Sequence, residues 1–433
     1  MKILVITRNA WDDTNAIGNT MSNFFGGLED AEFANIYFRN SEPHNKICSR
    51  YYQTSESDVI RNWFSPARIG RQKTVLTSEI SDFEAKDSNR EKTAIRFIQR
   101  NGIKVAYKLS DYVWYREKWI NQNLRAFIED FSPDVVFSFV KAAPQYYLTV
   151  RFLREQFKIP LISWIADDEY SGFLKAGLKR EIDNLAYILR ESAAVFGCSE
   201  ELCAYYNDIF GCKAEPLYKS CESFEPIRSG VNDPIKLVYA GNMLYGRADI
   251  LSKLADACDE CALNGTKAIL EIYSNTPLSP DEIRHYFGNS TCAEYMGKAD
   301  YETIKQKLHR ADIVLHVESF EPEQILKTKY SFSTKIIDYL QSGSLLLAVG
   351  PTETASIRYI RDIPGTCVID DCGSIYARLK ELLSDTGSFY RRKAAIRAFS
   401  GKNHNSSVSK QKLTEAFLEQ SQQRNKSDFS QQG

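Results

Sequence analysis

The sequence predicts an α/β protein built from two Rossmann-like, doubly wound domains. The chain has 433 residues, more than the roughly 100 to 200 of a typical single domain. Short apolar runs alternate with amphipathic stretches in both halves, as they do in parallel-sheet proteins. A polar segment with two prolines, 222–234, separates the two series. We therefore expect an N-terminal domain over 1–221, a linker over 222–234, a second domain over 235–385, and a C-terminal helix and polar tail over 386–433 that return to the first domain.

The expected strands are apolar runs too short for buried helices. In the first half they are predicted at 3–6, 35–38, 135–139, 161–165 and 193–196. In the second half they are predicted at 236–240, 269–273, 313–317, 345–349 and 367–369. Two such domains in tandem leave a cleft between the carboxyl ends of their sheets, where open α/β sheets bind ligands. The functional residues are therefore expected at these strand ends.

Composition excludes several classes of protein. Hydrophobic residues make up 43% of the chain and charged residues 26%, as in ordinary globular domains. The net charge of -1 gives no global field that would recruit nucleic acid, although small anionic ligands remain compatible with it. No apolar run approaches the roughly 20 residues of a spanning helix, and the chain opens on a strand without a signal-peptide pattern. These features predict a cytoplasmic protein.

The ten cysteines do not have the spacing of a disulfide framework, so free thiols are expected. Cys258 and Cys261 have C-x-x-C spacing, but they lie in an amphipathic helical stretch with no second pair that would complete a zinc site. The sequence predicts no metal centre there.

Residues 61–119 are the least sheet-like part of the first half, and two interpretations of them remain open. A helix that covers its own sheet shows aromatic residues inward and charges outward, whereas an interfacial helix uses the same mixture to contact anionic lipid headgroups. The covering helix is preferred, and peripheral contact with the inner face of a membrane is the alternative. The basic and aromatic residues concerned are Arg61, Trp63, Arg68, Arg71, Lys73, Lys104, Lys108, Trp114, Arg116, Lys118 and Trp119.

The segment SFSTKIIDYLQSGSLLLAVGP, from Ser331 to Pro351, is the most informative part of the chain. Ser333 and Thr334 at a predicted helix start offer hydroxyls and backbone N–H groups to a phosphate, where the helix dipole favours negative charge. Lys335 adds a formal charge. Asp338 lies one turn further on the same face, where its carboxylate can accept hydrogen bonds from ribose hydroxyls. The alternative is a capped amphipathic helix with Lys335 and Asp338 merely solvated.

A second anion-binding arrangement is predicted where the strand at 236–240 ends. Gly241 and Asn242 follow the strand, and Gly246 and Arg247 precede the next helix. The glycines permit a close backbone approach, and the Arg247 guanidinium can bind diphosphate oxygens through two parallel hydrogen bonds. In that place it offsets the charge that develops when a sugar–phosphate bond breaks.

These residues carry a resemblance to family 4-like glycosyltransferases, the GT-B enzymes of bacterial polysaccharide synthesis. KLVYAGNMLYGR resembles the family's strand, glycine loop and basic residue, and STKIIDYLQSG resembles its donor-binding helix. EYMGKADYETIKQKLHRADIVLHVE, which contains Gly297 and Glu318, resembles its base-binding turn and the helix and strand that follow. The resemblance covers roughly residues 234–385. In the first half, MKILVITRNAW, PDVVFSF and AAVFGCSEELCAYY suit the same order of elements.

The resemblance implies a retaining glycosyltransferase that moves a sugar from a nucleotide diphosphate donor, expected to be a UDP-sugar, to a glycan or lipid-linked glycan acceptor. It implies no metal and no other cofactor. The acceptor is expected to enter over the loop 15–20 of the first domain. The loop residues concerned are Asn15, Gly18, Asn19 and Thr20.

The chain departs from the family pattern at several positions. Asn242 stands where a second basic residue is usual, so phosphate binding depends more on Arg247 and Lys335. Tyr330 and Asp338 occupy the two positions of the family's paired glutamates. In place of the first domain's histidine, WIADDEYSG supplies Asp167 and Asp168.

Asp167 and Asp168 are the candidate catalytic residues on the acceptor side. Either carboxylate can accept a proton from a sugar hydroxyl or orient that hydroxyl. A strand-end Asx turn or a helix cap is the equally plausible structural role. At the end of the strand 313–317, His316 is expected to be a core histidine, and Glu318 to face the donor sugar.

Two other functions remain open from the sequence. A nucleotide-sugar epimerase or hydrolase needs the same donor pocket without an acceptor surface, and a non-catalytic partner subunit keeps the fold without the reaction. A dinucleotide-dependent oxidoreductase is disfavoured, because the first strand is followed by TRNAWDDTNAIGN and not by a G-x-G-x-x-G turn.

Overall fold

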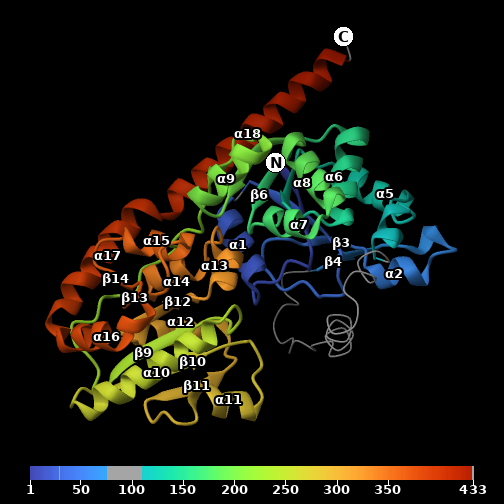
Figure 1. Ribbon diagram of the computed structural model, residues 1–433. Helices are drawn as coiled ribbons and strands as arrows, with labels where there is room; N and C mark the ends of the chain where they lie inside the picture. The colour runs from blue at the N-terminus through green and yellow to red at the C-terminus, as the bar shows by residue number, and fades with distance from the viewer. Residues whose placement is uncertain (29, 76–109, 432–433) are drawn as a thin grey trace. The chain divides into compact units, whose positions relative to one another are not determined.

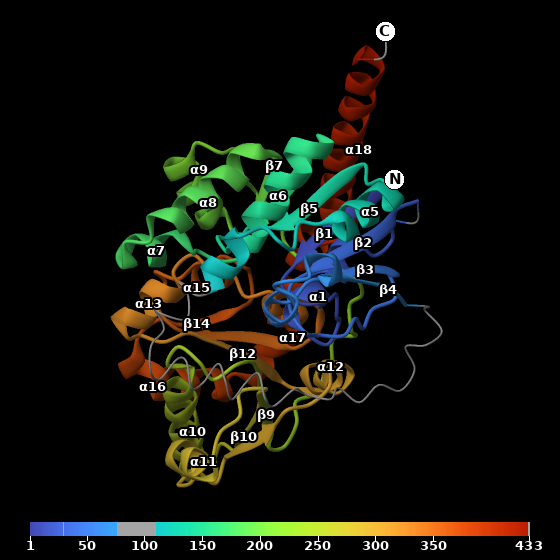
Figure 2. The same cartoon turned by 90° about the vertical axis from the view of Figure 1, so that its right-hand side faces the viewer.

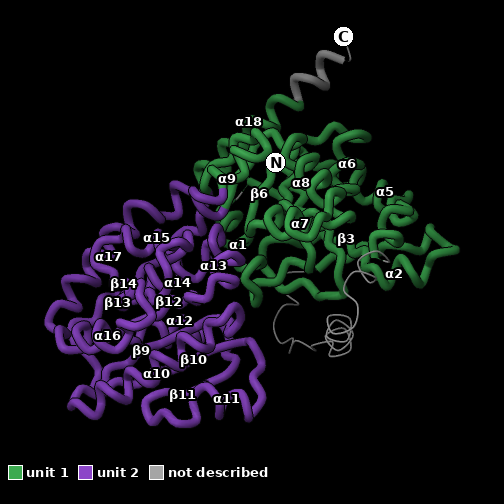
Figure 3. Tube along the Cα trace, in the orientation of Figure 1, with its two compact units in different colours: residues 1–197, 203–216, 410–433 green, residues 198–202, 217–409 purple. Residues whose placement is uncertain are grey.

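The computed structural model describes residues 1–28, 30–75 and 110–431. The chain divides into two compact units (Figure 3). Unit 1 comprises Met1–Gly197, Cys203–Pro216 and Lys410–Gly433, and unit 2 comprises Cys198–Leu202 and Leu217–Ser409. Each unit is therefore formed by segments that are distant in the sequence, and each is described by itself below.

Unit 1 is built on an eight-stranded sheet in the order β4-β3-β2-β1-β5-β6-β7-β8, most of which is labelled in Figure 2. All neighbouring strands are parallel except β3 and β4, which are antiparallel. The strands are β1 (Lys2–Thr7), β2 (Glu32–Tyr37), β3 (Arg50–Gln53), β4 (Arg71–Thr74), β5 (Val135–Phe139), β6 (Leu161–Ile165), β7 (Ser192–Gly197) and β8 (Glu215–Pro216).

Aromatic side chains dominate the core of unit 1. The Phe25 ring lies 5.1 Å from the ring of Phe137 in β5 and 6.1 Å from the ring of Phe417, so the C-terminal helix contributes to this core. The helices are α1 (Ala16–Phe25), α2 (Glu56–Arg61), η1 (Pro66–Arg68), α5 (Gln122–Phe131), α6 (Pro144–Phe157), α7 (Tyr170–Ala176), α8 (Lys179–Glu191), α9 (Glu200–Phe210) and α18 (Ser406–Gln431).

Unit 2 is built on a six-stranded, all-parallel sheet in the order β11-β10-β9-β12-β13-β14 (Figure 1). The strands are β9 (Ile235–Ala240), β10 (Ala268–Tyr273), β11 (Ala293–Gly297), β12 (Ile313–Val317), β13 (Leu345–Val349) and β14 (Cys367–Ile369). The central strands β12 and β13 are buried along their whole length, as continuous apolar runs in a doubly wound sheet should be.

Helices alternate with the strands of unit 2. Among them, α10 packs against both α11 and α16, and α14 packs against α17. They are α10 (Arg247–Leu263), α11 (Pro280–Phe287), α12 (Tyr301–Arg310), α13 (Pro322–Thr328), α14 (Lys335–Gln341), α15 (Ala355–Arg361), η3 (Cys372–Ser374), α16 (Ile375–Ser384), η4 (Thr386–Ser388) and α17 (Phe389–Asn403).

Every predicted apolar run overlaps a strand, and the prediction of two sheets in an α/β fold is confirmed. The sequence did not predict β3, β4, β8 or β11. The first two are four-residue strands near one edge of their sheet, β8 has two residues, and β11 alternates exposed with partly buried residues. None of them has the continuous apolar run on which the prediction depended.

The boundaries of the units differ from the expected domains. The segment 222–234 belongs to unit 2, which resumes at Leu217, and α17 also lies in unit 2. Of the expected C-terminal segment 386–433, only the part from Lys410 onward belongs to unit 1.

Residues 61–119, the part of the first half with the weakest strand pattern, contribute one short strand, because β4 pairs with β3 there. Trp114 and Trp119 are core residues with 1% and 0% of their surface exposed, in agreement with the preferred covering role. Lys104 and Lys108 lie outside the described residues. In the described part of the chain, no helix is long and apolar enough to cross a membrane.

All ten cysteines are free thiols, as predicted, and Cys258 and Cys261 are buried in α10. Among the described residues, no cluster of three or more histidine, cysteine, aspartate or glutamate side chains is placed to hold a metal ion.

Candidate donor site

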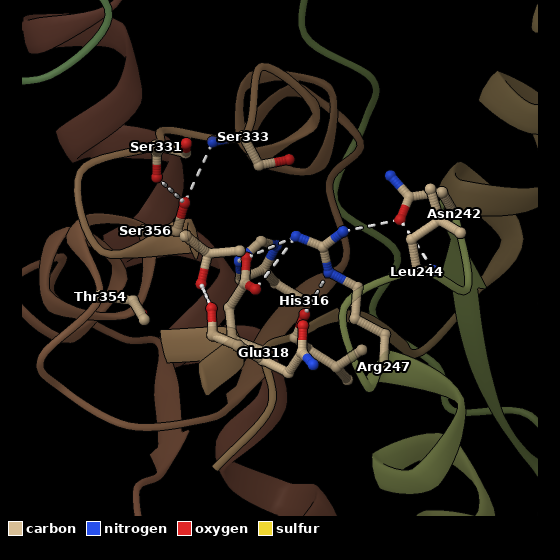
Figure 4. A network of polar contacts seen from close by, with 12 residues as sticks. Asn242, Leu244, Arg247, His316, Glu318, Ser331, Ser333, Thr354 and Ser356 are labelled. Atoms are coloured by element: carbon tan, nitrogen blue, oxygen red, sulfur yellow. Dashed lines mark hydrogen bonds and ion pairs between the residues drawn. The ribbon is translucent and has the colours of Figure 1, made fainter. Parts of the chain in front are cut away.

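The candidate donor site of unit 2 lies at the carboxyl ends of its central strands. β9 ends at Ala240 and leads to Gly241 and Asn242, and β12 ends at Val317 directly before Glu318. Arg247, the first residue of α10, lies between these two strand ends (Figure 4). Chain crossovers bring residues that are far apart in the sequence to one edge of the sheet, as expected for this topology.

Arg247 is held on three sides. Its Nη2 atom donates to both carboxylate oxygens of Glu318 at 2.9 and 3.0 Å, and its Nη1 atom donates to Oδ1 of Asn242 at 2.7 Å. Its Nε atom donates to the carbonyl oxygen of Val317 at 3.2 Å. The guanidinium is therefore fixed at the strand ends, and Asn242 positions the arginine.

The carboxylate of Glu318 is almost fully buried, with 2% of the residue exposed. Burial opposes its ionisation, but contact with His316 and the charge of Arg247 outweigh burial and hold its pKa below the ordinary value. His316 is 4% exposed, and its Nε2 lies 3.4 Å from a Glu318 oxygen. Glu318 is thus an ionised, buried partner of Arg247.

Two glycines permit the tight turn between β9 and α10. A Cβ atom on Gly241 would lie 2.4 Å from the Tyr239 hydroxyl, which donates to the carbonyl oxygen of Asn242 at 2.5 Å. Gly246 has a φ of +72°, and a Cβ atom there would lie 2.6 Å from Oγ of Ser319. Larger residues would displace the turn that carries Arg247.

Lys335 and Asp338 extend the cluster of charges along α14. Lys219 donates to Oδ1 of Asp338 at 2.6 Å, and only 5% of the lysine side chain is exposed. Lys335 is partly exposed as a residue, but burial of its ammonium group, followed by repulsion from Arg247, lowers its pKa. The attraction of Asp338 opposes this shift without cancelling it.

The start of α14 differs from the capped helix that was the alternative to a phosphate site. Thr334 is the N-cap residue, but its side chain makes no capping hydrogen bond. The backbone N–H of Ser333 donates to Oγ of Ser356 at 3.0 Å, and this hydroxyl donates to the carbonyl oxygen of Ser331 at 3.1 Å (Figure 4). Among the described residues, no hydrogen bond engages the hydroxyl of Ser333 or that of Thr334.

Taken together, the cluster contains more cations than anions. Arg247, Lys335 and Lys219 carry three positive charges, and Glu318 and Asp338 carry two negative charges. Burial is the main cause of the lowered pKa of Lys335, and repulsion from Arg247 is the second cause. A bound anion at this edge would relieve that repulsion.

Gly297 ends β11 and has a φ of +72°, with open space where a Cβ atom would lie. Its carbonyl oxygen accepts a hydrogen bond from the backbone N–H of Ser274 at 2.8 Å. Its predicted role at the nucleotide base stays a prediction.

The predicted acceptor-side loop of unit 1 is wrong in its secondary structure, because α1 begins at Ala16. Asn15 is the N-cap residue and accepts a hydrogen bond from the backbone N–H of Gly18 at 2.9 Å. Gly18, Asn19 and Thr20 are helical, and Gly18 lies against the backbone of Asp12. The cap at Asn15 extends the helix over residues that were expected to form a loop.

Asp168 has the structural role, in a turn or cap before α7, that was the alternative to a catalytic role. Its Oδ1 accepts hydrogen bonds from the backbone N–H of Ser171 at 3.2 Å and from the Tyr206 hydroxyl at 3.4 Å. Asp167 is exposed and lies two residues beyond the end of β6.

Lys219 is the residue of the cluster that the sequence did not predict. It stands outside any helix or strand and outside every motif that drew attention to the site. Only the close approach of residues 217–221 to α14 reveals its partner, Asp338.

Two α/β units with this strand order define the GT-B type of fold. Solved structures that cover 94–97% of this chain share this fold, although each is only about 10% identical to it in sequence. A sucrose-phosphate synthase from Thermosynechococcus elongatus is 10% identical with a TM-score of 0.64, over 97% of this chain and 98% of the other.

Two further structures are similar to this chain. The Anabaena protein HepE in complex with UDP and glucose is 10% identical with a TM-score of 0.61, over 97% of this chain and 100% of the other. WaaG, a glycosyltransferase involved in lipopolysaccharide biosynthesis, is 10% identical with a TM-score of 0.57, over 94% and 98%. No protein-family model and no curated protein matches the sequence.

Proposed function

We propose that the protein is a retaining glycosyltransferase that moves a hexosyl group from a UDP-sugar to a glycan or lipid-linked glycan acceptor. The observation that carries the proposal is the Arg247 guanidinium, which is fixed between Asn242 and Glu318 at the carboxyl edge of the unit 2 sheet, with Lys335 in the first turn of α14 as a second cation. A diphosphate bound there would be neutralised where its charge grows as the sugar leaves. The choice of UDP is supported by the similar structures, whose names include complexes with UDP and UDP-glucose.

In the proposed reaction, the bond between the anomeric carbon and the diphosphate oxygen breaks, and the acceptor oxygen takes its place. Arg247 and Lys335 stabilise the departing diphosphate, and the free hydroxyls of Ser333 and Thr334 donate to its oxygens. Asp338 binds the ribose. Asp167, exposed at the end of β6, is the proposed acceptor-side carboxylate that takes the hydroxyl proton, with Asp168 holding the turn.

The proposal includes no metal ion. The side-chain cations supply the charge neutralisation that a bound divalent ion gives in other phosphate-transfer sites. Turnover in the presence of a chelator tests this point directly, since a metal-dependent enzyme would lose its activity.

Thermal stabilisation by nucleotides tests the donor site without an acceptor. UDP at 100 times its Kd should stabilise the protein by about 2.7 kcal/mol. Removal of one charged hydrogen-bond partner of the diphosphate should weaken binding roughly tenfold or more. Because Arg247→Ala alone would leave Glu318 buried and unpaired, the informative variant is the double replacement Arg247→Met with Glu318→Gln. Arg284→Ala, at an exposed position on α11, is the matched control.

The result distinguishes the proposal from its alternatives. UDP stabilisation that falls by about 1.4 kcal/mol or more in the double variant and persists in Arg284→Ala supports a donor site. Release of UDP from a UDP-sugar without any acceptor, at the full rate, would favour an epimerase or hydrolase. A folded protein that no nucleotide stabilises would favour a non-catalytic partner subunit and contradict the proposal.

We also propose a peripheral contact with an anionic membrane surface through unit 1. Phe64 is 93% exposed and Ile60 51% exposed, and the Lys118 ammonium lies 4.3 Å from the centre of the Trp63 ring. Apolar side chains beside cations suit an interface with anionic headgroups. Phe64→Ser should reduce sedimentation with phosphatidylglycerol vesicles and leave UDP binding unchanged. Equal sedimentation of both proteins would refute the contact.

A further inference from the structure

Unit 1 contains a polar pocket of about 220 Å³ that the donor site does not involve. It is smaller than the roughly 300–1,000 Å³ of pockets for drug-sized ligands, so it suits one small group. The pocket lies at the carboxyl edge of the sheet: Gln53 is the last residue of β3, and Asn40 follows the end of β2. This is the edge at which open α/β sheets bind ligands.

The antiparallel strand β4 explains why an arginine reaches this edge. Because β4 runs opposite to its neighbour, it begins where β3 ends, and its first residue, Arg71, pairs with Gln53. Side chains of directly paired residues lie on the same face of a sheet. Arg61, the last residue of α2, supplies the second guanidinium of the pocket.

Among the described residues that line the pocket, Asp58 is the one carboxylate, and protein groups occupy it. Asp58 accepts hydrogen bonds from the backbone N–H of Gly70 at 2.9 Å and from the Asn62 side chain at 3.0 Å. It is 7% exposed, and its Oδ1 lies 3.8 Å from the Arg71 guanidinium. Asp58 thus fixes the start of β4 and orients Arg71.

Gly70 is required for this construction. Its φ is +85°, and a Cβ atom there would lie 1.9 Å from the Tyr52 hydroxyl. The turn before Arg71 is therefore closely packed against β3.

The guanidinium groups of Arg61 and Arg71 remain able to bind a ligand. The Arg71 side chain is 61% exposed, and its ion pair with Asp58 is long, at 3.8 Å. Arg61 is also exposed and has no ion-pair partner among the residues that the structure describes. Two arginines against one satisfied carboxylate leave the pocket positive. The hydroxyls of Ser55 and Ser57, 3.0 Å apart, add neutral hydrogen-bonding groups on the wall.

From this arrangement we infer that the pocket binds the anionic group, a phosphate or a carboxylate, of a hydroxylated ligand of the size of a monosaccharide. Arginine pairs bind such groups through charge-assisted hydrogen bonds, and serine and amide side chains suit the hydroxyls of a sugar. The ligand is the sugar acceptor of the reaction, a role that rests on the proposed function.

Thermal stabilisation of the full chain tests the inference with four probes: glucose 6-phosphate, glucuronate, glucose and inorganic phosphate. A sugar anion should stabilise the protein more than glucose or inorganic phosphate does. Arg61→Ala and Arg71→Ala should each raise the Kd for that sugar anion roughly tenfold or more. The preferred sugar anion identifies the group as phosphate or carboxylate. Arg68→Ala is the control, because Arg68 is exposed in the same segment and does not line the pocket.

Equal responses to glucose and to both sugar anions, or a response that neither arginine variant changes, would overturn the inference. So would a response to inorganic phosphate as strong as that to glucose 6-phosphate. Stabilisation by UDP serves as the independent readout of the donor site. If UDP binds and no sugar anion does, this inference fails alone; if a sugar anion binds through Arg61 and Arg71 and UDP does not bind, the proposed transferase fails alone.

Discussion

At the scale of single residues, the partners of Arg247 decide how the proposed donor site would bind a diphosphate. In the structure its guanidinium is bound by Glu318 and Asn242, and Glu318 is buried and ionised. A diphosphate that takes the guanidinium must compete with that carboxylate. The remaining attraction for the ligand comes from Lys335, whose positive charge no neighbour fully balances.

The lowered pKa of Lys335 predicts a pH dependence of nucleotide binding. A diphosphate binds the charged form of this lysine. Burial and the charge of Arg247 lower its pKa, so the lysine loses its proton at a pH below its usual pKa of 10.5. Affinity for UDP should therefore fall as pH rises from neutral toward that value, measured by calorimetry at constant ionic strength.

Lys335→Arg gives the matched control, since arginine stays protonated throughout that range. Its pH profile should be flat. An equally steep loss of affinity in Lys335→Arg would assign the dependence to another group.

At the scale of elements, glycines decide where helices and strands approach closely. Gly18 in α1 lies so near the preceding turn that a Cβ atom would be 1.9 Å from the carbonyl oxygen of Asp12. Gly172 in α7 has nothing within 4 Å of the same position. The two helical glycines of unit 1 therefore make a matched pair.

Gly18→Ala should destabilise unit 1 by about 1–3 kcal/mol, because the added methyl group must displace backbone atoms. Gly172→Ala should be neutral or stabilise it by about 0.4–1 kcal/mol, since alanine favours a helix and nothing is displaced. Urea unfolding followed by circular dichroism measures both. A Gly18→Ala protein as stable as the parent would show that α1 can shift away from Asp12 at little cost.

Elements also show where prediction from the sequence is limited. Buried parallel strands such as β12 and β13 are continuous apolar runs and were predicted with their observed bounds. The strand β4, RQKT, is entirely polar or charged and has no such run. It pairs with β3 because the turn at Gly70 and the carboxylate of Asp58 hold it there. Those contacts come from the fold and not from local propensity.

At the scale of the whole molecule, the C-terminal segment contributes to both units: its first part belongs to unit 2 and its last part to unit 1. α17 packs on α14 in unit 2, and the chain from Lys410 onward joins the core of unit 1 through Phe417. His404, after α17, is 1% exposed, and its carbonyl oxygen accepts a hydrogen bond from the backbone N–H of Cys221.

Burial lowers the pKa of His404 to about 4 from its usual 6.5. The unfolded chain therefore binds more protons at this position between about pH 4 and 6.5, and the folded protein loses stability as pH falls through that window. The full effect amounts to about 3 kcal/mol. Urea unfolding of His404→Phe at pH 7.5 and pH 5 should show a smaller difference than the parent does.

His285→Asn is the control, because His285 is exposed on α11. It should keep the parent's pH dependence. If His404→Phe kept that dependence as well, the loss of stability at low pH would belong to other groups.

The sequence by itself determined the fold class and pointed to a cluster of residues at the strand ends of the second sheet. Apolar runs report buried strands directly, because burial on both faces leaves no place for polar side chains. Glycine, arginine and lysine beside strand ends report an anion site, since the strand ends share one edge. Gly241, Asn242, Arg247 and Glu318 were predicted from these local patterns, and the structure brings them together.

The tertiary structure alone decided the partners of those residues. The pairing of Lys219 with Asp338 and that of Arg247 with Glu318 join segments that are distant in the sequence. The placement of Arg61 and Arg71 in one pocket depends on how the chain between them folds. The role of Asn15 as a helix cap and of Asp168 as a turn acceptor depends on which neighbour each side chain reaches. A local pattern specifies the residues that can make such contacts, but only the folded chain specifies the groups that they contact.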